Sequence, residues 1–293
     1  MAKLKWYISA QEFLALKNDI KPVIRQGIEK GDVNILGKLL KKEKMCILPK
    51  TLDIPRSVNE HPISHKKSIV AYISKSMKLA RDAYHADKEN DQLTLGKLLG
   101  YPECCVNFYQ YKIPHPTGDD FSFVLHTFHK TEGKPSFYTN NIFNLQTRVN
   151  TAYKLKIFNR FKNILGDQAK YFLISHLPCS YRCKESMKTG KKILKFLKEE
   201  DREFAKNVVY SLKKIFLVMD DFNFISFDGR ANGNSIYYQA ANPFLTACPS
   251  DKFTRGNKVI VDGNEIKILK DGDLLHKAGI PIGNAKILDF SCR

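Results

Sequence analysis

Four cysteines of this sequence fall in two tight pairs, and thiolate sulfur is a strong ligand for soft metals. Cys104 and Cys105 are adjacent in LGYPECCVNFY, whereas Cys179 and Cys183 lie four residues apart in SHLPCSYRCKES. Adjacent cysteines do not easily close a disulfide with each other. The two pairs therefore predict one metal centre that is held by four thiolates.

A proline precedes each pair at the predicted start of a helix. Pro102 and Pro178 suit a first helical turn, because proline lacks the N–H that has no helical partner there. The positive end of a helix also favours thiolate. We expect one helix from about Pro178 to Leu197, with Cys179 in its first turn and Cys183 one turn later on the inward face. The four sulfur atoms should then converge within a volume about 7 Å across.

The leading prediction for the bound group is an iron–sulfur cluster of the 4Fe-4S type. A cluster spreads its thiolates over several irons, whereas an adjacent pair strains a tetrahedral zinc site. Zinc is the alternative cofactor, and reversible thiol redox at Cys179 and Cys183 or structural cysteines are further alternatives. Ligation by three cysteines would leave one iron open as a Lewis acid. Cys248 is a possible substitute ligand, and Cys46 and Cys292 are interpreted as ordinary cysteines.

Three polar residues near the second pair are candidates for chemistry. His176 can ligate a metal, move a proton or bind an anion. Arg182 and Lys184 flank Cys183 and can hold a phosphate or carboxylate group. The alternatives are a histidine bonded to the backbone and solvated charges on a helix.

The motifs L-G-Y-P-x-C-C and H-x-P-C-S-x-x-C-x-x-S, taken together, resemble a family of uncharacterised, mostly archaeal proteins classed as a domain of unknown function. The resemblance covers about residues 90–190 and implies no established activity. It implies that the motif residues share one site: Gly100, Tyr101, Pro102, Cys104, Cys105, His176, Pro178, Cys179, Ser180, Cys183 and Ser186. Together with the flanking charges, it gives the catalytic candidates His176, Ser180 and Arg182. The substrate-binding candidates are Tyr101, Lys184 and Ser186.

The charge of the chain points to a polyanionic partner. The formal net charge is +18. Residues 1–50 hold 11 Lys and Arg against 5 Asp and Glu, and residues 184–214 hold 10 against 5. Such an excess favours nucleic acid, tRNA or a single strand, through counterion release. A nucleotide-like metabolite is a second possibility, and a basic proteome or high internal salt is the alternative explanation.

These features lead to three functions. The first is an iron–sulfur-dependent enzyme, a transferase or lyase, that acts on nucleic acid, for example in tRNA base modification or sulfur chemistry, or on a nucleotide-like metabolite. The second is a zinc-stapled, basic nucleic-acid-binding protein without catalysis. The third is a thiol redox protein. Seven cysteines, an odd number, with no export signal and no apolar run that spans a bilayer predict a cytoplasmic protein without a membrane partner. The oligomeric state is not indicated.

The predicted fold class is α/β (α+β) in three parts. A helical N-terminal segment and linker cover residues 1–65, with helices including KPVIRQGIEKG. A central α/β, cysteine-bearing domain covers 66–214, with helices expected over 68–86, 151–166 and 201–213. It also includes a short helix, LTLGKLLG, that Gly100 ends, and a short strand, KYFLISHLP, ending at His176. A β-rich region covers 215–293 and includes a hairpin with Asp262 and Gly263 at its turn.

Overall fold

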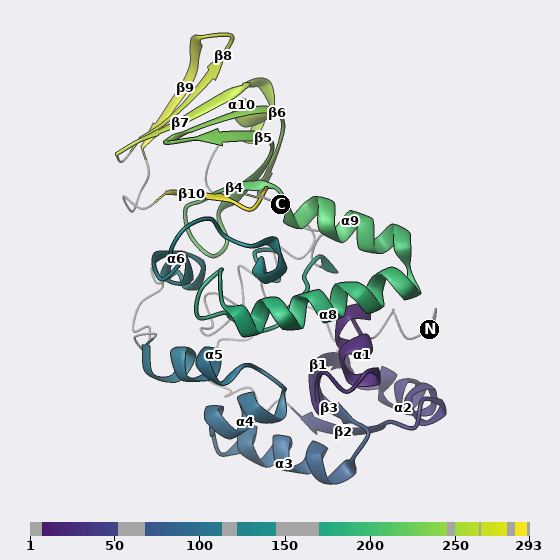
Figure 1. The fold of residues 1–293 in the computed structure, drawn as a ribbon. Coiled ribbons are helices and arrows are strands. Elements are labelled where there is room, and N and C mark those ends of the chain that lie inside the picture. Colours follow the sequence, from purple (N-terminus) through teal and green to yellow (C-terminus); the bar gives the residue numbers. More distant parts are fainter. Residues whose placement is uncertain are drawn as a thin grey trace, which may run out of the picture. The chain divides into compact units, whose positions relative to one another are not determined.

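A computed structural model describes residues 8–51, 68–112, 122–144, 170–244, 250–263, 265–279 and 285–291. The chain forms two compact units, residues 1–112 and 113–293. Helices and strands are mixed, with helices prevailing before residue 214 and strands after it, which confirms the predicted class (Figure 1). The three-part division stays a prediction. The helix expected over 151–166 lies outside the described residues, as do Cys248 and Cys292.

The first unit begins with alternating helices and strands. They are α1 (Ala10–Lys17), β1 (Val23–Glu29), α2 (Val33–Lys42), β2 (Cys46–Thr51) and β3 (Ser68–Ser74). The strands form an antiparallel sheet in the order β1-β3-β2. Ser9 caps α1, since its side chain accepts a hydrogen bond from Glu12 N.

Two helices predicted in this unit are wrong. KPVIRQGIEKG forms β1, and the first half of the helix expected over 68–86 is β3. The reason is the burial of β3 on both faces: Ile69 and Ile73 pack into one core and Val70 and Tyr72 into another. A strand buried on both faces is a continuous apolar run, in which periodicity does not distinguish a strand from a helix.

Three helices complete the first unit: α3 (Met77–Lys88), α4 (Gln92–Leu98) and α5 (Glu103–Asn107). Ser76 and Asp91 cap α3 and α4 with their side chains. Gly100, at φ +69°, ends α4 as predicted, and a π-helical turn over Phe108–Lys112 extends α5.

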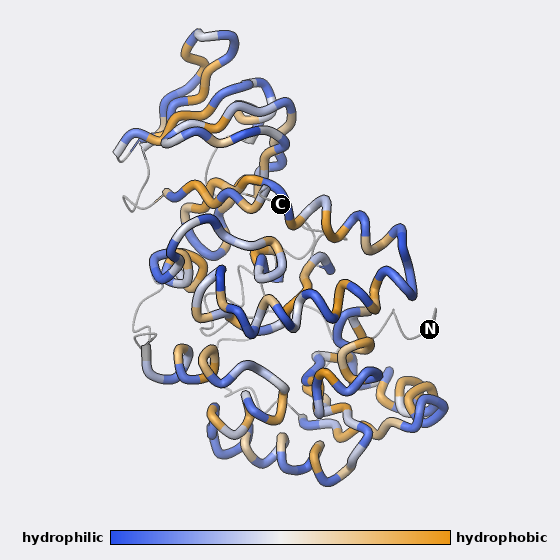
Figure 2. Tube along the Cα trace, viewed as in Figure 1, coloured by the Kyte–Doolittle hydropathy of each residue, from blue (hydrophilic) through white to orange (hydrophobic). Residues whose placement is uncertain are grey.

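The helical part of the second unit contains α6 (Phe123–His129), α8 (Lys184–Glu200) and α9 (Arg202–Leu212). Figure 2 shows hydrophobic and hydrophilic residues alternating along α8 and α9, and the buried stripe of α8 includes Ile193, Leu194 and Leu197. The helix that was predicted to start at Pro178 starts six residues later, at Lys184. The strand predicted to end at His176 is also wrong, because residues 171–183 form turns and bends.

A seven-stranded antiparallel sheet forms the C-terminal part of the second unit. Its order is β10-β4-β5-β6-β7-β8-β9. The strands are β4 (Ile215–Val218), β5 (Phe224–Asn232), β6 (Ser235–Phe244), β7 (Lys258–Asp262), β8 (Glu265–Lys270), β9 (Asp273–Gly279) and β10 (Lys286–Asp289).

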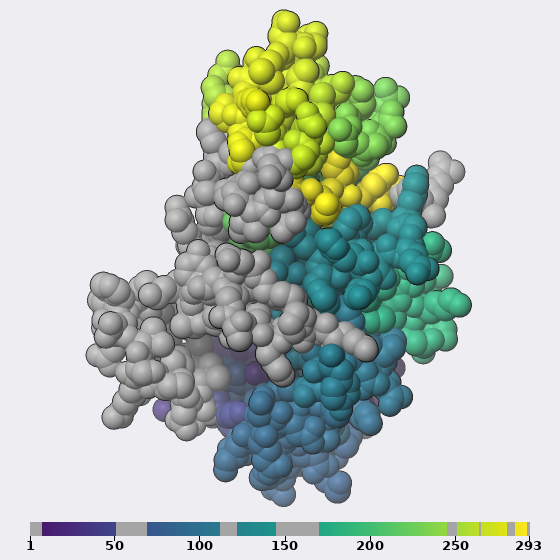
Figure 3. All heavy atoms as spheres, turned by 90° about the vertical axis from the view of Figure 1, so that its left-hand side faces the viewer, coloured from purple at the N-terminus to yellow at the C-terminus, as the bar shows by residue number. Residues whose placement is uncertain are grey.

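One face of this sheet carries the core, and α10 (Ser250–Arg255) covers it with the buried Phe253. The predicted hairpin is confirmed, with Gly263 at φ +57° between β7 and β8. The edge of the sheet that β9 forms is largely exposed, and the space-filling view shows this end of the unit open to solvent on the side that faces the viewer (Figure 3). Within the described ranges, no helix combines the length and the apolar character that crossing a bilayer requires.

Candidate metal centre

The two cysteine pairs come together. The sulfur atoms of Cys104, Cys105, Cys179 and Cys183 all lie within 4.8 Å of one another. The sulfurs of the adjacent pair are 3.9 Å apart, and the described cysteines form no disulfide. The predicted convergence is confirmed. A set of four thiols fits a soft metal that prefers sulfur ligands, such as zinc or iron.

The first pair owes its position to the turn that precedes α5. A Cβ atom at Gly100 would lie 3.1 Å from both Ile20 O and Lys21 Cα, so glycine lets this segment pass close to the end of α1. Pro102 then acts as the N-cap residue of α5, and its carbonyl accepts a hydrogen bond from Cys105 N at 2.9 Å. This pair lies in the first turn of a helix, as predicted.

Burial differs within the first pair. The side chain of Cys104 is exposed, whereas Cys105 is only 2% exposed. A metal bound here would therefore have one ligand that solvent can reach and one that it cannot.

Tyr101 lies over a buried ion pair. The Lys21 ammonium is 2.7 Å from a Glu12 carboxylate oxygen and 5.1 Å from the centroid of the Tyr101 ring. Both charged residues are buried, so each needs the other to offset the cost of leaving water. Tyr101 thus helps to anchor the LGYP turn, and its assignment to substrate binding stays a prediction.

The second pair lies in a turn that is fixed by residues distant in the sequence. Thr127 Oγ1 donates a hydrogen bond to Pro178 O, and Tyr181 N donates to Thr131 Oγ1 at 2.9 Å. The Tyr181 carbonyl accepts from Ser136 N at 2.9 Å and from Thr139 Oγ1 at 2.7 Å. The backbone between the two cysteines is therefore held on both sides.

The relation of the second pair to α8 differs from the prediction. Cys183 is the N-cap residue of α8, and its N–H donates to Ser180 O at 2.9 Å. Cys179 precedes the helix, so the two cysteines do not share a helical face. Hydrogen bonds from residues 127–139 decide this conformation, and they cannot be deduced from the spacing of the cysteines.

Two of the catalytic candidates stabilise the turn itself. Ser180 Oγ accepts a hydrogen bond from Arg182 N at 3.1 Å. Arg182 is exposed, and its Nη1 donates to Glu132 O at 3.3 Å. A Cβ at Gly133 would lie 2.7 Å from that nitrogen, so the glycine makes room for the guanidinium. Lys184, the first residue of α8, is also exposed.

The remaining candidates bond to each other. His176 Nε2 and Ser186 Oγ are 2.8 Å apart, and both side chains are buried. The His176 carbonyl accepts from Asn141 Nδ2 at 2.9 Å. The His176–Ser186 pair thus connects the segment before the cysteine turn to α8. Catalysis and substrate binding by these two residues stay predictions.

Sequence reasoning missed the residues that support the turn: Thr127, Thr131, Thr139 and Asn141. The run of asparagines in TNNIFN, buried among aromatic residues, was the available signal, because a buried amide needs hydrogen-bond partners. Asp221 was also missed. Its buried carboxylate accepts from Ser122 Oγ, Phe123 N and Val124 N, and so it caps α6, the helix that carries Thr127.

Cys46 lies apart from the four-cysteine group. Its thiol donates to Ser74 O at 3.1 Å across the first sheet, and burial raises the pKa of the Cys46 thiol. Its interpretation as an ordinary cysteine agrees with this position.

A family model described as "Protein of unknown function (DUF483)" matches residues 58–214, which is more than half of the chain. The chain therefore belongs to this family. The matched segment contains all four cysteines and ends before β4. No curated protein and no solved structure matches the chain.

Proposed function

We propose that this member of the DUF483 family is a metalloprotein whose four cysteine thiolates hold a metal, and that it binds nucleic acid. The observation that carries the proposal is the convergence of four sulfurs within 4.8 Å. The protein's own hydrogen bonds, such as those to Tyr181, hold the cysteine turn, so little ordering is needed on metal binding.

The sulfur separations favour a single metal ion. Four thiolates bound tetrahedrally to one zinc at about 2.3 Å have sulfurs about 3.8 Å apart. The separations here, 3.9 Å for the adjacent pair and at most 4.8 Å for any pair, are close to that value. In a 4Fe-4S cluster each thiolate binds a different iron, which sets the sulfurs farther apart. The best-supported function is therefore the zinc-stapled nucleic-acid-binding protein.

The exposure of Cys104 favours a second candidate, the iron–sulfur-dependent enzyme. A ligand that solvent reaches is the easiest to replace, and an iron held by three buried or half-buried thiolates can accept a substrate atom as a Lewis acid. A transferase or lyase that modifies a tRNA base or moves sulfur would use such a site. His176, Ser180 and Arg182 are its catalytic candidates, and Tyr101, Lys184 and Ser186 its substrate-binding candidates.

The proposal of a nucleic-acid partner is supported by charge. Besides the net charge of +18, α8 exposes a row of lysines: Lys184, Lys188, Lys191, Lys192, Lys195 and Lys198. Binding to tRNA or a single strand should weaken steeply with salt, because each neutralised phosphate releases a counterion. The cytoplasm is the compartment we propose, since it keeps such thiols reduced.

The test is anaerobic purification followed by iron and zinc analysis and an absorbance spectrum. We expect about one zinc per chain and no visible absorbance. A brown protein with several irons per chain would establish the iron–sulfur candidate instead. A protein that takes up neither metal after anaerobic reconstitution, and forms a reversible disulfide between Cys179 and Cys183, would overturn the proposal in favour of thiol redox.

A further inference from the structure

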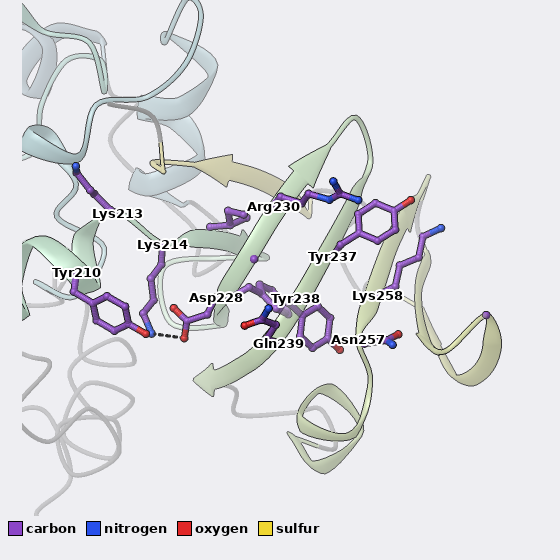
Figure 4. Close-up of a pocket in the computed structure, with 14 residues that line it drawn as sticks. Tyr210, Lys213, Lys214, Asp228, Arg230, Tyr237, Tyr238, Gln239, Asn257 and Lys258 are labelled. Carbon is purple, nitrogen blue, oxygen red and sulfur yellow. Dashed lines mark hydrogen bonds and ion pairs between the residues drawn. The ribbon is translucent and has the colours of Figure 1, made fainter.

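The second unit contains an open pocket of about 1020 Å³ on the C-terminal sheet, and most of its lining residues follow the segment that the family model matches. Residues from the end of α9 and from β5, β6 and β7 line it (Figure 4). Four of the lining residues are cations, namely Lys213, Lys214, Arg230 and Lys258, and one, Asp228, is a carboxylate. The pocket is therefore positively charged.

A cation–tyrosine–cation row crosses three neighbouring strands of this pocket. Arg230 on β5 pairs in register with Tyr237 on β6, and Tyr237 pairs with Lys258 on β7. The Arg230 guanidinium carbon is 5.3 Å from the centroid of the Tyr237 ring, and Lys258 Nζ is 4.9 Å from it. Figure 4 shows the three side chains side by side. The sheet thus holds an aromatic face between two positive charges.

The two cations of this row are available to a ligand. Among the described residues, neither Arg230 nor Lys258 has a carboxylate within ion-pair distance. The one acid of the pocket is already neutralised, since Asp228 lies 3.1 Å from Lys214 Nζ. Lys213 faces the Phe137 ring instead, with its Nζ 4.8 Å from the centroid.

A β-bulge shapes this part of the sheet. The register of β5 and β6 shifts between Asp228 and Gly229, one residue before Arg230. A Cβ at Gly229 would lie 1.9 Å from Tyr237 O, so only glycine permits the approach of the two backbones. Bulges redirect side chains and are frequent beside binding sites.

A second tyrosine lies at the other end of the pocket. Tyr210 is 60% exposed, and Lys214 Nζ is 4.7 Å from the centroid of its ring. Tyr210 thus adds an accessible aromatic ring at the end of α9, beside a lysine that is paired with Asp228. Gln239, between the two tyrosines in the lining, exposes an amide that can donate and accept hydrogen bonds.

We infer that this pocket binds single-stranded nucleic acid, with a base stacked on Tyr237 and phosphates bound by Arg230 and Lys258. Both cations have flexible stems and can move from the ring to a phosphate. Accessible rings beside cations are how proteins bind single strands without sequence preference, whereas a duplex offers no free base faces. The inference deepens the proposed function and rests on it only for the partner class, because the pocket is separate from the metal ligands in the sequence and does not need the metal.

The test measures binding of a fluorescent single-stranded RNA of about ten mixed nucleotides by anisotropy over a series of salt concentrations. We expect Tyr237→Ala to raise the Kd at least about fivefold, and Tyr237→Phe to bind like wild type, because stacking needs the ring and not its hydroxyl. We expect Arg230→Gln to lower the slope of log Kd against log salt by about 0.7, the value for one phosphate of a single strand.

Two variants serve as matched controls. Lys277→Gln removes an exposed lysine from β9 of the same sheet, and Tyr111→Ala removes a tyrosine that is 64% exposed in the first unit. Both should bind the RNA as wild type does. Equal binding of duplex RNA, or equal competition by polyglutamate of the same charge, would overturn the assignment to single strands.

Metal content of every preparation separates this inference from the proposed function. If wild type binds the RNA and Tyr237→Ala binds equally well, the pocket is wrong and the nucleic-acid partner stands. If wild type carries metal but binds no RNA at low salt, both the partner and the pocket are wrong and the metal site stands. If wild type binds RNA through the Tyr237 row but takes up no metal, the pocket is right and the metal site is wrong.

Discussion

The two cysteine pairs supply equivalent ligands from unlike surroundings. Cys104 and Cys105 lie at the start of a five-residue helix, positioned by their own neighbours Gly100 and Pro102, and one of the two is exposed. Cys179 and Cys183 lie in a turn that side chains more than forty residues away hold by hydrogen bonds: Tyr181 N donates to Thr131 Oγ1, and Thr139 Oγ1 donates to Tyr181 O. The first pair is positioned through the turn directly before it, whose Gly100 packs against Ile20 and Lys21, and the second through hydrogen bonds from a distant segment to its own backbone.

This difference predicts different roles for the two pairs in metal binding. A turn whose backbone polar groups are hydrogen-bonded on both sides is held by the protein itself, because breaking it would leave buried groups unsatisfied. A short helix start with an exposed thiol can adjust to the ion that the turn presents. The cysteine turn should therefore dominate affinity, and the exposed Cys104 at the helix start should tolerate change.

The largest expected effect comes from removing a ligand of the turn. Cys183→Ser should reduce bound metal from about one per chain to near zero and lower the Tm by about 10 °C or more, because the binding energy of a closed site is also folding energy. Metal analysis and thermal unfolding of anaerobic protein measure both. Cys179→Ser should behave alike.

Cys46→Ser is the matched control, since it removes a cysteine that is not in the group. It should leave the metal content intact. A Cys183→Ser protein with the metal content of wild type would show that this thiolate is not a ligand.

The next effect concerns the packing that holds the turn. A Cβ at Gly190 on α8 would lie 2.5 Å from Tyr138 O. This oxygen belongs to the backbone and cannot turn aside as a flexible side chain can, so α8 would have to move away from the segment that binds Tyr181. Gly190→Ala should lower the free energy of unfolding by about 2–3 kcal/mol in urea and weaken metal binding.

Gly279→Ala is its control, because no atom lies within 4 Å of the added methyl group and its φ is not in the left-handed region. If both variants unfold at the same urea concentration, the close packing of α8 on this segment does not support the turn.

A smaller effect is expected at the first pair. Cys104→Ser should leave the fold intact and lower metal affinity by about tenfold, since water or the serine hydroxyl can occupy an exposed ligand position. Competition with a chromophoric chelator measures the affinity. Cys105→Ser, at a buried position, should lose far more. If Cys104→Ser and Cys105→Ser lose the same metal affinity, the solvent exposure of a ligand does not decide its contribution to binding.

The same contrast explains which part of the centre could be predicted from the sequence. The start of α5 at Pro102 and the end of α4 at Gly100 follow from local rules for proline and glycine, and both were predicted correctly. The start of α8 was predicted six residues too early, because residues 178–183 satisfy their polar groups through a distant segment instead of through helical bonds.

The prediction of strands is limited in the same way, because it also depends on local sequence signals. The hairpin of β7 and β8 was predicted correctly, because the turn residues Asp262 and Gly263 separate its two strands. The prediction of a helix at β3 was wrong. Ile69 and Tyr72 are buried on opposite faces of this strand, so the alternation of apolar and polar residues that marks a strand is missing. The row of Arg230, Tyr237 and Lys258 depends on strand register across a bulge, which the sequence does not reveal.

The smallest expected effect tests the hydroxyl group of Thr131. This Oγ1 accepts a hydrogen bond from Tyr181 N at 2.9 Å, donates to Thr127 O at 2.9 Å and lies 3.4 Å from Ser180 Oγ. Thr131→Val keeps the shape of the side chain but leaves the Tyr181 N–H without this acceptor, which should cost about 1 kcal/mol of unfolding free energy. Thr131→Ser retains the hydroxyl and should recover most of the loss.

Thr189→Val is the comparison, because that hydroxyl donates only to Glu185 O of its own helix, and we expect it to change stability by less than about 0.5 kcal/mol. The decisive measurement is the rate of metal release to excess chelator. If the second pair is held by its tertiary hydrogen bonds, release should be faster from Thr131→Val than from Thr189→Val. Equal rates would mean that the turn keeps its shape without Thr131, and that its position at the start of α8 is sufficient to orient both thiolates.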